Sequence, residues 1–370
     1  MDSALLSRQV LDVCLNIRKG EKVWIDGWDH TVELTSLLAL ACQERGCEVF
    51  LTLKTEDFWF RAIREGPVRQ LERLSRQQRA VLNETDVYIF TLGPSNPVRW
   101  ESVPTPRRGL ATVWLLEQNK FVDQWKAIAR RRRIRMLGIE ATLATPERAK
   151  ALGLRYETWM NVMYSGCVAD YRRVAKLTKR LSRILRGSGR VHVTTPHGTD
   201  FTFELAERPV LSDDGLATFD KAKEGRVVFL PAGDVEVSAD EESAEGTVVY
   251  DAPILSRHGT VRQLRVEVSR GRVIRYRAAT GRNLFKRYIE ESEGDADRFG
   301  FIGFGTNPNL RHGFTQDDKV LGGVTIGFGE NASKGGRNKG KGLSDWWGSM
   351  TTATVTIDGK KVMRRGELLV

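Results

Sequence analysis

The chain has 370 residues, 41% hydrophobic and 28% charged, a composition typical of a globular protein that excludes a disordered or disulfide-stapled one. Its length favours two domains over a single small module. With 58 lysines and arginines against 47 acids, the net charge is +11, which favours acidic partners without by itself indicating nucleic acid.

The first 115 residues alternate between strand and helix patterns. Helices are expected at 5–15, 32–41 and 67–82, and strands at 22–26, 48–53, 86–91 and 111–116. Strand, helix and strand in this order predict a parallel sheet with right-handed crossovers. This part of the chain is therefore predicted to be a doubly wound α/β domain.

Helical patterns follow at 121–133, 147–151 and 159–186, and their arginines and lysines are expected to face solvent. Beyond residue 187 the period changes to two, with strands expected at 190–195, 200–204, 226–230, 246–251, 261–268, 272–278, 324–328 and 352–357, and a helix at 284–291. We therefore expect an N-terminal α/β domain over 1–186 and a C-terminal, mostly antiparallel α+β domain over 187–370.

Targeting signals and cysteine chemistry are not expected. No window is apolar enough to span a membrane, and the N-terminus lacks a basic region ahead of an apolar one. The four cysteines are Cys14, Cys42, Cys47 and Cys167, and none forms a CxxC pair. We predict a cytoplasmic protein with buried thiols.

Familiar cofactor motifs are missing or incomplete. The turn at 26–30 lacks the GxGxxG fingerprint of a dinucleotide site. Residues 335–342 resemble the start of a phosphate loop but lack a Ser or Thr after Lys341. No GxSxG elbow, HxxxH or HxH spacing occurs. The sequence predicts no nucleotide cofactor, and no serine nucleophile is recognisable.

The C-terminal third is dense in glycine. Residues 300–309 and 322–331 alternate glycine with large apolar side chains, and Trp346 and Trp347 follow. Such glycines mark close backbone packing or bulges, and they also line ligand clefts. Both interpretations stay open, and the paired tryptophans favour a cleft.

In their order along the chain, these segments resemble the metallo-aminopeptidase family of aminopeptidase T and aminopeptidase S, whose relatives include 2,5-dihydroxypyridine dioxygenases. The resemblance covers 13–25, 198–201, 230–235, 244–249, 303–308 and 318–331. It implies an N-terminal α/β domain, a β-rich domain that holds the site, and a homodimer around an internal cavity.

The metal ligands of that family are largely replaced here. The resemblance places the family's acid at Asp234, but Phe301 and Thr325 stand where it has an acid or histidine and a histidine. Its His-Trp-Asp signature aligns with Asp345, Trp346 and Trp347. Aromatic rings cannot ligate a divalent metal, so we expect no bound metal, no cofactor and no aminopeptidase activity.

The site is instead expected to hold a peptide, with no catalytic residue. Its candidate residues are Asp234, Phe301, Thr325, Asn331, Arg337, Asn338, Asp345, Trp346 and Trp347. The first hypothesis is a pseudoenzyme that presents a precursor peptide, such as an acidic leader, to modifying enzymes in natural-product biosynthesis. An alternative is an enzyme, aminopeptidase-like or metal-independent, that uses Asp234, Asp345 and Glu245. A further alternative is that the aromatic rings fill the pocket and leave no room for a ligand. Nucleic-acid binding is also retained, but it rests on charge alone.

Overall fold

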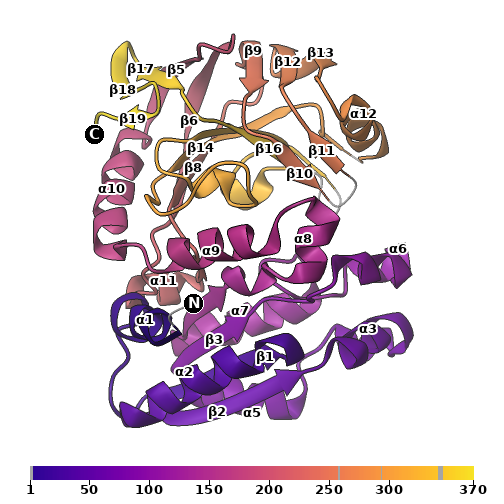
Figure 1. Cartoon of the computed structure of the whole chain (residues 1–370), viewed down its shortest axis with the longest axis vertical. Coiled ribbons are helices and arrows are strands. Elements are labelled where there is room, and N and C mark those ends of the chain that lie inside the picture. Colours follow the sequence, from indigo (N-terminus) through magenta and orange to yellow (C-terminus); the bar gives the residue numbers. More distant parts are fainter. Residues whose placement is uncertain (1–2, 257–258, 293, 341–344) are drawn as a thin grey trace. The chain divides into compact units, whose positions relative to one another are not determined.

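A computed structural model describes residues 3–256, 259–292, 294–340 and 345–370, which form two compact units (Figure 1). The first unit is the chain up to Tyr171 together with Gly215–Ala232, and the second is Arg172–Asp214 together with the chain from Gly233. These units differ from a single division after residue 186, because the 172–186 region lies in the second unit and 215–232 returns to the first.

The first unit is built on a parallel sheet, as predicted. In its described part the strand order is β2-β1-β3-β4-β7, and every neighbouring pair is parallel. The strands are β1 (Lys22–Trp28), β2 (Glu48–Lys54), β3 (Val87–Thr91), β4 (Arg135–Ile139) and β7 (Val227–Leu230). β3 and β4 are buried throughout, which explains their unbroken apolar runs.

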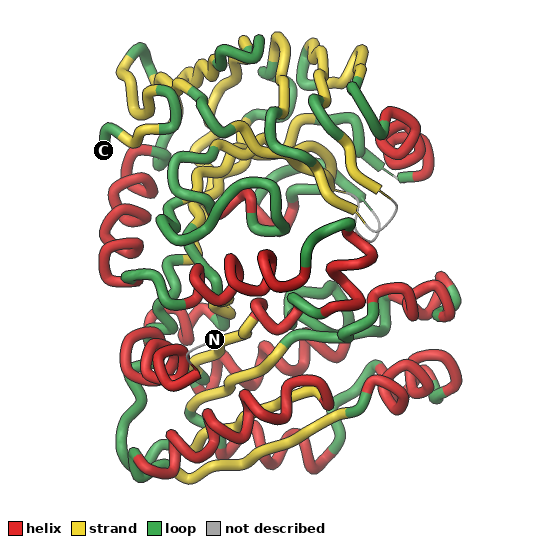
Figure 2. The backbone as a smooth tube through the Cα atoms, viewed as in Figure 1, coloured by secondary structure: helices red, strands yellow, loops and turns green. Residues whose placement is uncertain are grey.

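Helices separate these strands along the chain, as Figure 2 shows in red and yellow. They are α1 (Ser3–Arg8), α2 (Val32–Glu44), α3 (Glu56–Glu65), α4 (Val68–Leu71), α5 (Arg76–Glu84), α6 (Thr105–Arg108), α7 (Lys120–Arg132), α8 (Pro146–Leu152), α9 (Tyr156–Cys167) and α11 (Phe219–Glu224). A π-helical turn, Gln9–Cys14, continues α1. The long helix expected over 159–186 is divided between α9 and α10 (Tyr171–Ile184).

Two strands expected from the sequence, 111–116 and 226–230, differ from the expectation in the structure. Residues 111–116 form a loop because the Glu117 carboxylate accepts the backbone N–H groups of Val113, Trp114 and Leu116, which removes donors that a ladder would use. The strand expected at 226–230 exists as β7, but it pairs in parallel with β4 in the first unit's sheet.

The second unit is built on an antiparallel sheet of twelve strands within the described residues. Its main path is β16-β15-β14-β8-β6-β5-β17-β18-β19, and β9, β12 and β13 branch from β6. The strands are β5 (Ser188–Thr194), β6 (Asp200–Asp213), β8 (Asp234–Ala239), β9 (Glu245–Tyr250), β12 (Leu264–Ser269), β13 (Arg272–Arg277), β14 (Phe299–Gly305), β15 (Val324–Gly329), β16 (Asp345–Met350), β17 (Thr354–Ile357), β18 (Lys360–Arg364) and β19 (Glu367–Leu368).

A separate ribbon and two helices complete this unit: β10 (Ile254–Ser256) with β11 (Gly259–Val261), α10 (Tyr171–Ile184) and α12 (Arg282–Glu291). One face of the large sheet buries an apolar core in which Phe201, Phe203 and Phe299 contact one another. This architecture confirms the predicted β-rich second part. None of the described helices has the length and apolarity that a bilayer crossing requires.

Candidate functional site

Four neighbouring strands of the second unit, β8, β14, β15 and β16, carry most of the predicted site. Side chains alternate along each strand, so residues that pair across the ladder share a face. One face joins the core through Val235, Ile302, Ile326 and Met350. We call the opposite face the glycine-rich face; it carries Asp234, Glu236, Ser238, Phe301, Gly303, Gly305, Thr325, Gly327, Trp347 and Ser349.

The ladder register brings Phe301 and Trp347 into one row. Phe301 pairs with Ser238 on β8 and with Gly327 on β15, and Gly327 pairs with Trp347 on β16. The Phe301 ring lies over Gly327, where a Cβ atom would overlap it. Phe301 is buried and Trp347 is partly exposed. Solvent therefore reaches the Trp347 end of this row but not the Phe301 end.

Gly327→Ala is expected to destabilise the protein by about 1–3 kcal/mol, because the added methyl group displaces the Phe301 ring. Chemical denaturation measures this change. The double variant G327A/F301A removes the ring, so the cost of the G327A step should fall to near zero in that background. An equal cost of G327A in both backgrounds would contradict this packing.

A lysine ammonium already neutralises one carboxylate on the face. Lys334 Nζ lies 3.4 Å from Glu236 Oε2 and 4.5 Å from the centroid of the Phe301 ring. The Ser238 hydroxyl donates to the Lys334 carbonyl oxygen at 3.1 Å, which helps to hold this residue over the sheet. Lys334 therefore places positive charge beside Glu236.

Asp234 begins β8 on the same face. Loss of hydration raises the pKa of its carboxyl well above the usual range, and the neighbouring Glu236 and Asp213 carboxylates raise it further. Lys319 opposes this shift only in part. Asp234 is thus a carboxyl group that releases its proton at a higher pH than an ordinary aspartate does.

Thr325, which stands where the resemblance implies a histidine, is fully buried. Its Oγ1 lies 2.9 Å from Ser349 Oγ, the residue opposite it on β16, and the two hydroxyls share a hydrogen bond. This position therefore has two neutral hydroxyl groups that are hydrogen-bonded to each other, and it has no imidazole.

Trp346 and Trp347 point to opposite faces, as neighbours on a strand must. Trp346 lies in the core, stacks on Phe328 at 4.6 Å between ring centroids, and contacts Phe285 at 4.5 Å. Its indole N–H donates to the Ala296 carbonyl oxygen at 3.0 Å. The structure therefore places Trp346 in the core, away from the glycine-rich face. Asp345 pairs with Gly329, and its side chain lies outside the described part.

Asn331 and Asn338 are buried and bind the main chain. Asn331 Nδ2 donates to the Gly300 carbonyl oxygen, and Asn338 Nδ2 donates to the carbonyl oxygens of Phe299 and Gly329. These bonds fix the 330–340 loop to β14 and β15. Arg337, the third predicted handle in this loop, has an exposed side chain and uses its backbone N–H for Glu241. Residues 341–344, which include part of the phosphate-loop-like segment, lie outside the described residues.

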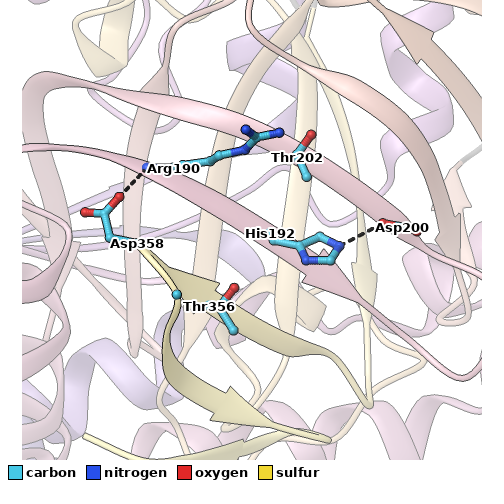
Figure 3. Close-up of a pocket in the computed structure, with 7 residues that line it drawn as sticks. Arg190, His192, Asp200, Thr202, Thr356 and Asp358 are labelled. Carbon is cyan, nitrogen blue, oxygen red and sulfur yellow. Dashed lines mark hydrogen bonds and ion pairs between the residues drawn. The ribbon is translucent and has the colours of Figure 1, made fainter.

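A separate polar pocket of about 640 Å³ lies against β5, β6 and β17 (Figure 3). Its centre is His192, whose Nε2 lies 2.7 Å from Asp200 Oδ1, and both side chains are solvent-exposed. Thr202 and Thr356 flank His192 in the ladder, but no hydrogen bond joins either hydroxyl to the imidazole. The arrangement is a hydrogen-bonded His–Asp pair on the surface without an activated nucleophile.

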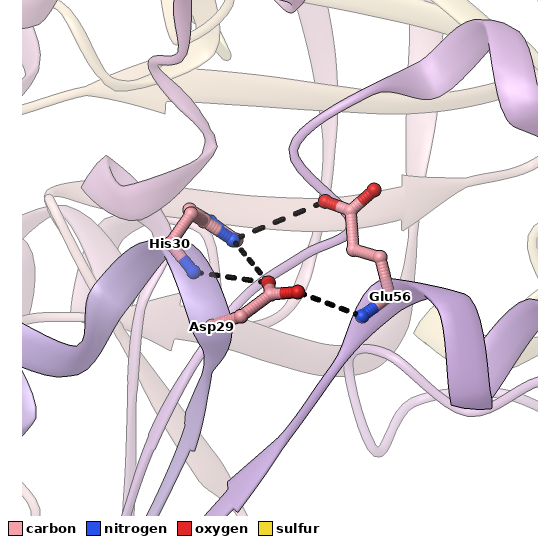
Figure 4. Close-up of side chains that lie close together, drawn as sticks. All are labelled: Asp29, His30 and Glu56. Carbon is pink, nitrogen blue, oxygen red and sulfur yellow. Dashed lines mark hydrogen bonds and ion pairs between the residues drawn. The ribbon is translucent and has the colours of Figure 1, made fainter.

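In the first unit, Asp29, His30 and Glu56 converge after β1 and β2 (Figure 4). His30 Nδ1 lies 3.7 Å from Asp29 Oδ1 and 4.0 Å from Glu56 Oε1. Glu56 also accepts the Ser95 N–H and lies 3.7 Å from Arg99, while Asp29 accepts the Glu56 N–H. These contacts already use the carboxylates to join the loops after β1, β2 and β3.

The chain matches the family model described as thermophilic metalloprotease (M29) over residues 5–312. The chain belongs to this M29 family. Comparison with the curated proteins gives no match. The fold is similar to 2,5-dihydroxypyridine dioxygenase from Pseudomonas putida KT2440 (TM-score 0.63, 16% identity) and to wild-type AmpT from Thermus thermophilus (TM-score 0.64, 19% identity). Each match covers 100% of this chain and 98% of the other.

The M29 family name implies a metal, but the described side chains of the glycine-rich face do not fit one. Within the described residues, three potential ligands converge only at Asp29, His30 and Glu56, in the other unit. On the glycine-rich face, Glu236 is paired with an ammonium, and burial raises the pKa of the Asp234 carboxyl. A divalent ion needs several deprotonated ligands around one point, which this donor set does not supply.

Three residues at the glycine-rich face, Glu236, Ser349 and Lys334, were not predicted from the sequence. Glu236 and Ser349 were detectable, because DVEVSA and the residues after Trp347 alternate and place them on the faces of Asp234 and Trp347. Lys334 lies in a glycine-rich loop almost 100 residues from Glu236, and no local pattern indicates that they pair.

Proposed function

We propose that this M29-family chain is a metal-free, non-hydrolytic peptide-binding protein on an aminopeptidase scaffold. In this role it is a cytoplasmic, homodimeric accessory protein that presents a precursor peptide to modifying enzymes in natural-product biosynthesis. The observation that carries the proposal is the Lys334 ammonium, which lies 3.4 Å from Glu236 beside the buried Phe301 ring. The ammonium neutralises the Glu236 carboxylate, and the Phe301 ring fills the space beside it. Neither group supplies the free ligands that a hydrolytic metal ion would need.

Peptide contact is assigned to the accessible members of the face. Trp347 is partly exposed and supplies aromatic area, while Asp234 and Glu236 supply polar groups at its other end. Phe301 and Thr325 form the buried floor beneath them. A surface of this kind would bind a peptide through a few anchors and fix its orientation with polar contacts.

Trp347→Ala is expected to weaken peptide binding about tenfold or more, because an aromatic anchor is lost. The probe is a fluorescein-labelled pool of random dodecapeptides, followed by fluorescence anisotropy. His192→Ala, a substitution in the separate polar pocket of Figure 3, is the matched control and should bind like the wild type.

Hydrolysis is tested in parallel with leucine p-nitroanilide in the presence of Zn²⁺, Mn²⁺ or Co²⁺. The proposal expects peptide binding with no release of p-nitroaniline and no stoichiometric metal in the purified protein. Metal-dependent release, or wild-type affinity in the Trp347 variant, would contradict it.

A second candidate is a metal-independent enzyme, favoured by the raised pKa of Asp234, since a raised pKa brings a carboxyl closer to the range in which it can act as a general acid. Glu245 does not support it, because its carboxylate accepts the Arg270 N–H at 2.7 Å on an exposed turn. Asp234→Asn discriminates the two: an enzyme loses turnover and keeps affinity, whereas a binding protein shows no turnover in either form.

A further inference from the structure

Two arginines face each other directly across a strand pair in the second unit. β12 and β13 lie side by side as a hairpin (Figure 1). The hairpin is closed by Arg270 and Gly271, and in its register Arg265 lies opposite Arg277. Directly opposed like charges destabilise an antiparallel pair. The opposed arginines therefore lower the stability of the strand pair, and a function that uses their positive charge would explain why they are there.

Arg275 joins them on the same face, two residues before Arg277. We call Arg265, Arg275 and Arg277 the arginine surface. Within the described residues, none of their guanidinium groups has an ion-pair or hydrogen-bond partner. Glu267 lies opposite Arg275 in the ladder but does not form an ion pair with it. The three guanidinium groups therefore have no direct ion pair within the described residues, although the Glu267 carboxylate lies among them.

Protection of a sheet edge explains only part of this pattern. β12 is the one described strand that pairs with β13, although Arg272 and Val273 at its start also contact the 297–298 segment, and charged side chains on such an edge strand discourage aggregation. Arg265, however, lies on β12, which is paired on both sides by β9 and β13. Edge protection gives no reason for an arginine there, opposite another arginine.

From this juxtaposition we infer that the arginine surface docks a carboxylate-rich peptide segment. Guanidinium groups bind carboxylates in bidentate geometry, and beyond Val273 the outer edge of β13 is not paired with any described strand, so it offers backbone groups to an extended chain. The inference rests on the proposed peptide-binding function and names where an acidic part of the peptide is held.

A peptide fits this surface better than nucleic acid does. Glu267 lies among the arginines, and Asp200 follows in the same ladder row through Thr247, so carboxylates interrupt the positive charge that a phosphate backbone would track. Tyr276, the nearby aromatic residue, packs edge-on against Phe285 and is not presented for base stacking.

The test measures binding of fluorescein-labelled (Glu-Gly)6 by anisotropy, with (Gln-Gly)6 as the neutral counterpart. R265Q/R277Q is expected to weaken binding of the acidic probe about 5- to 30-fold and to reduce its salt dependence. The matched control is K179Q/R183Q, which removes two exposed neighbouring charges from α10 and should bind like the wild type.

A stability measurement separates docking from a structural role. Because the opposed arginines repel, R265Q/R277Q should melt at the same temperature as the wild type or higher. Equal binding by R265Q/R277Q and the wild type, or displacement of the probe by a 12-base-pair DNA duplex at a lower concentration than by unlabelled (Glu-Gly)6, would overturn the inference.

Failure of the inference is distinguishable from failure of the proposed function. If the wild type binds the random dodecapeptide pool through Trp347 but ignores (Glu-Gly)6, the arginine surface has no docking role and the peptide-binding proposal stands. If it binds neither probe, both fail.

Discussion

Trp346→Ala is expected to lower the free energy of unfolding by about 3–5 kcal/mol, one of the two largest effects foreseen here. The indole is buried in the core of the second unit, where it stacks on Phe328 and contacts Phe285 edge-on. Alanine leaves a cavity and also leaves the Ala296 carbonyl oxygen without its indole donor. Urea denaturation followed by far-UV circular dichroism measures the change.

Trp347→Ala is the matched control, because it removes the same side chain from the next position on β16. Trp347 faces the other way and is partly exposed, so its loss should cost about 1 kcal/mol or less. The two variants should therefore have opposite phenotypes, with Trp346 affecting stability and Trp347 affecting peptide binding. A larger stability loss from Trp347 than from Trp346 would refute this assignment of the faces.

Much of the fold follows from local patterns in the sequence. The alternation of helices and strands before residue 110 predicts the parallel sheet, and the change to period two beyond residue 187 predicts the antiparallel one. The return of β7 to the first sheet is not predictable in this way, because four apolar residues pack equally well in either sheet. Only tertiary pairing with β4 decides it.

The candidate site likewise has some features that local sequence patterns predict and others that they do not. Alternation on a strand already implies that Trp346 and Trp347 face opposite ways, so treating them as one aromatic pair overlooked an available signal. The roles of Asn331 and Asn338 could not be foreseen, because a polar side chain in a glycine-rich loop has the same local pattern whether it binds a ligand or the main chain. In the structure both side chains are buried and donate to main-chain carbonyl oxygens.

Glu241 joins this loop to the sheet, and no local pattern indicates it. Its carboxylate accepts hydrogen bonds from the Arg208 guanidinium, from Asn331 Nδ2 at 3.1 Å and from the Arg337 N–H at 2.6 Å. The side chains of Arg208 and Glu241 are only 10% and 4% exposed. Burial raises the pKa of Glu241, but these hydrogen bonds outweigh it and lower the pKa to about 2.

Glu241→Gln is expected to cost about 2–4 kcal/mol at neutral pH, because it leaves the buried Arg208 guanidinium without a counter-charge. The effect also depends on pH in a defined direction. A carboxylate whose pKa falls on folding stabilises the folded state fully above its ordinary value of 4.5, and this contribution disappears as the pH falls through about 2. The stability difference between the wild type and E241Q should therefore shrink steadily between pH 5 and pH 2.

Asp297→Asn supplies the control for this comparison. Asp297 is also paired with an arginine, since Nη1 of Arg272 donates to both of its carboxylate oxygens, but both side chains are well exposed, at 32% and 47%. Solvent screening limits such a pair to about 1 kcal/mol or less, so D297N should change stability little at any pH. Denaturation series from pH 7 to pH 2 measure both variants. A pH-independent loss in E241Q would mean that the carboxylate acts through shape and hydrogen bonding, and that its charge contributes nothing to holding the loop on the sheet.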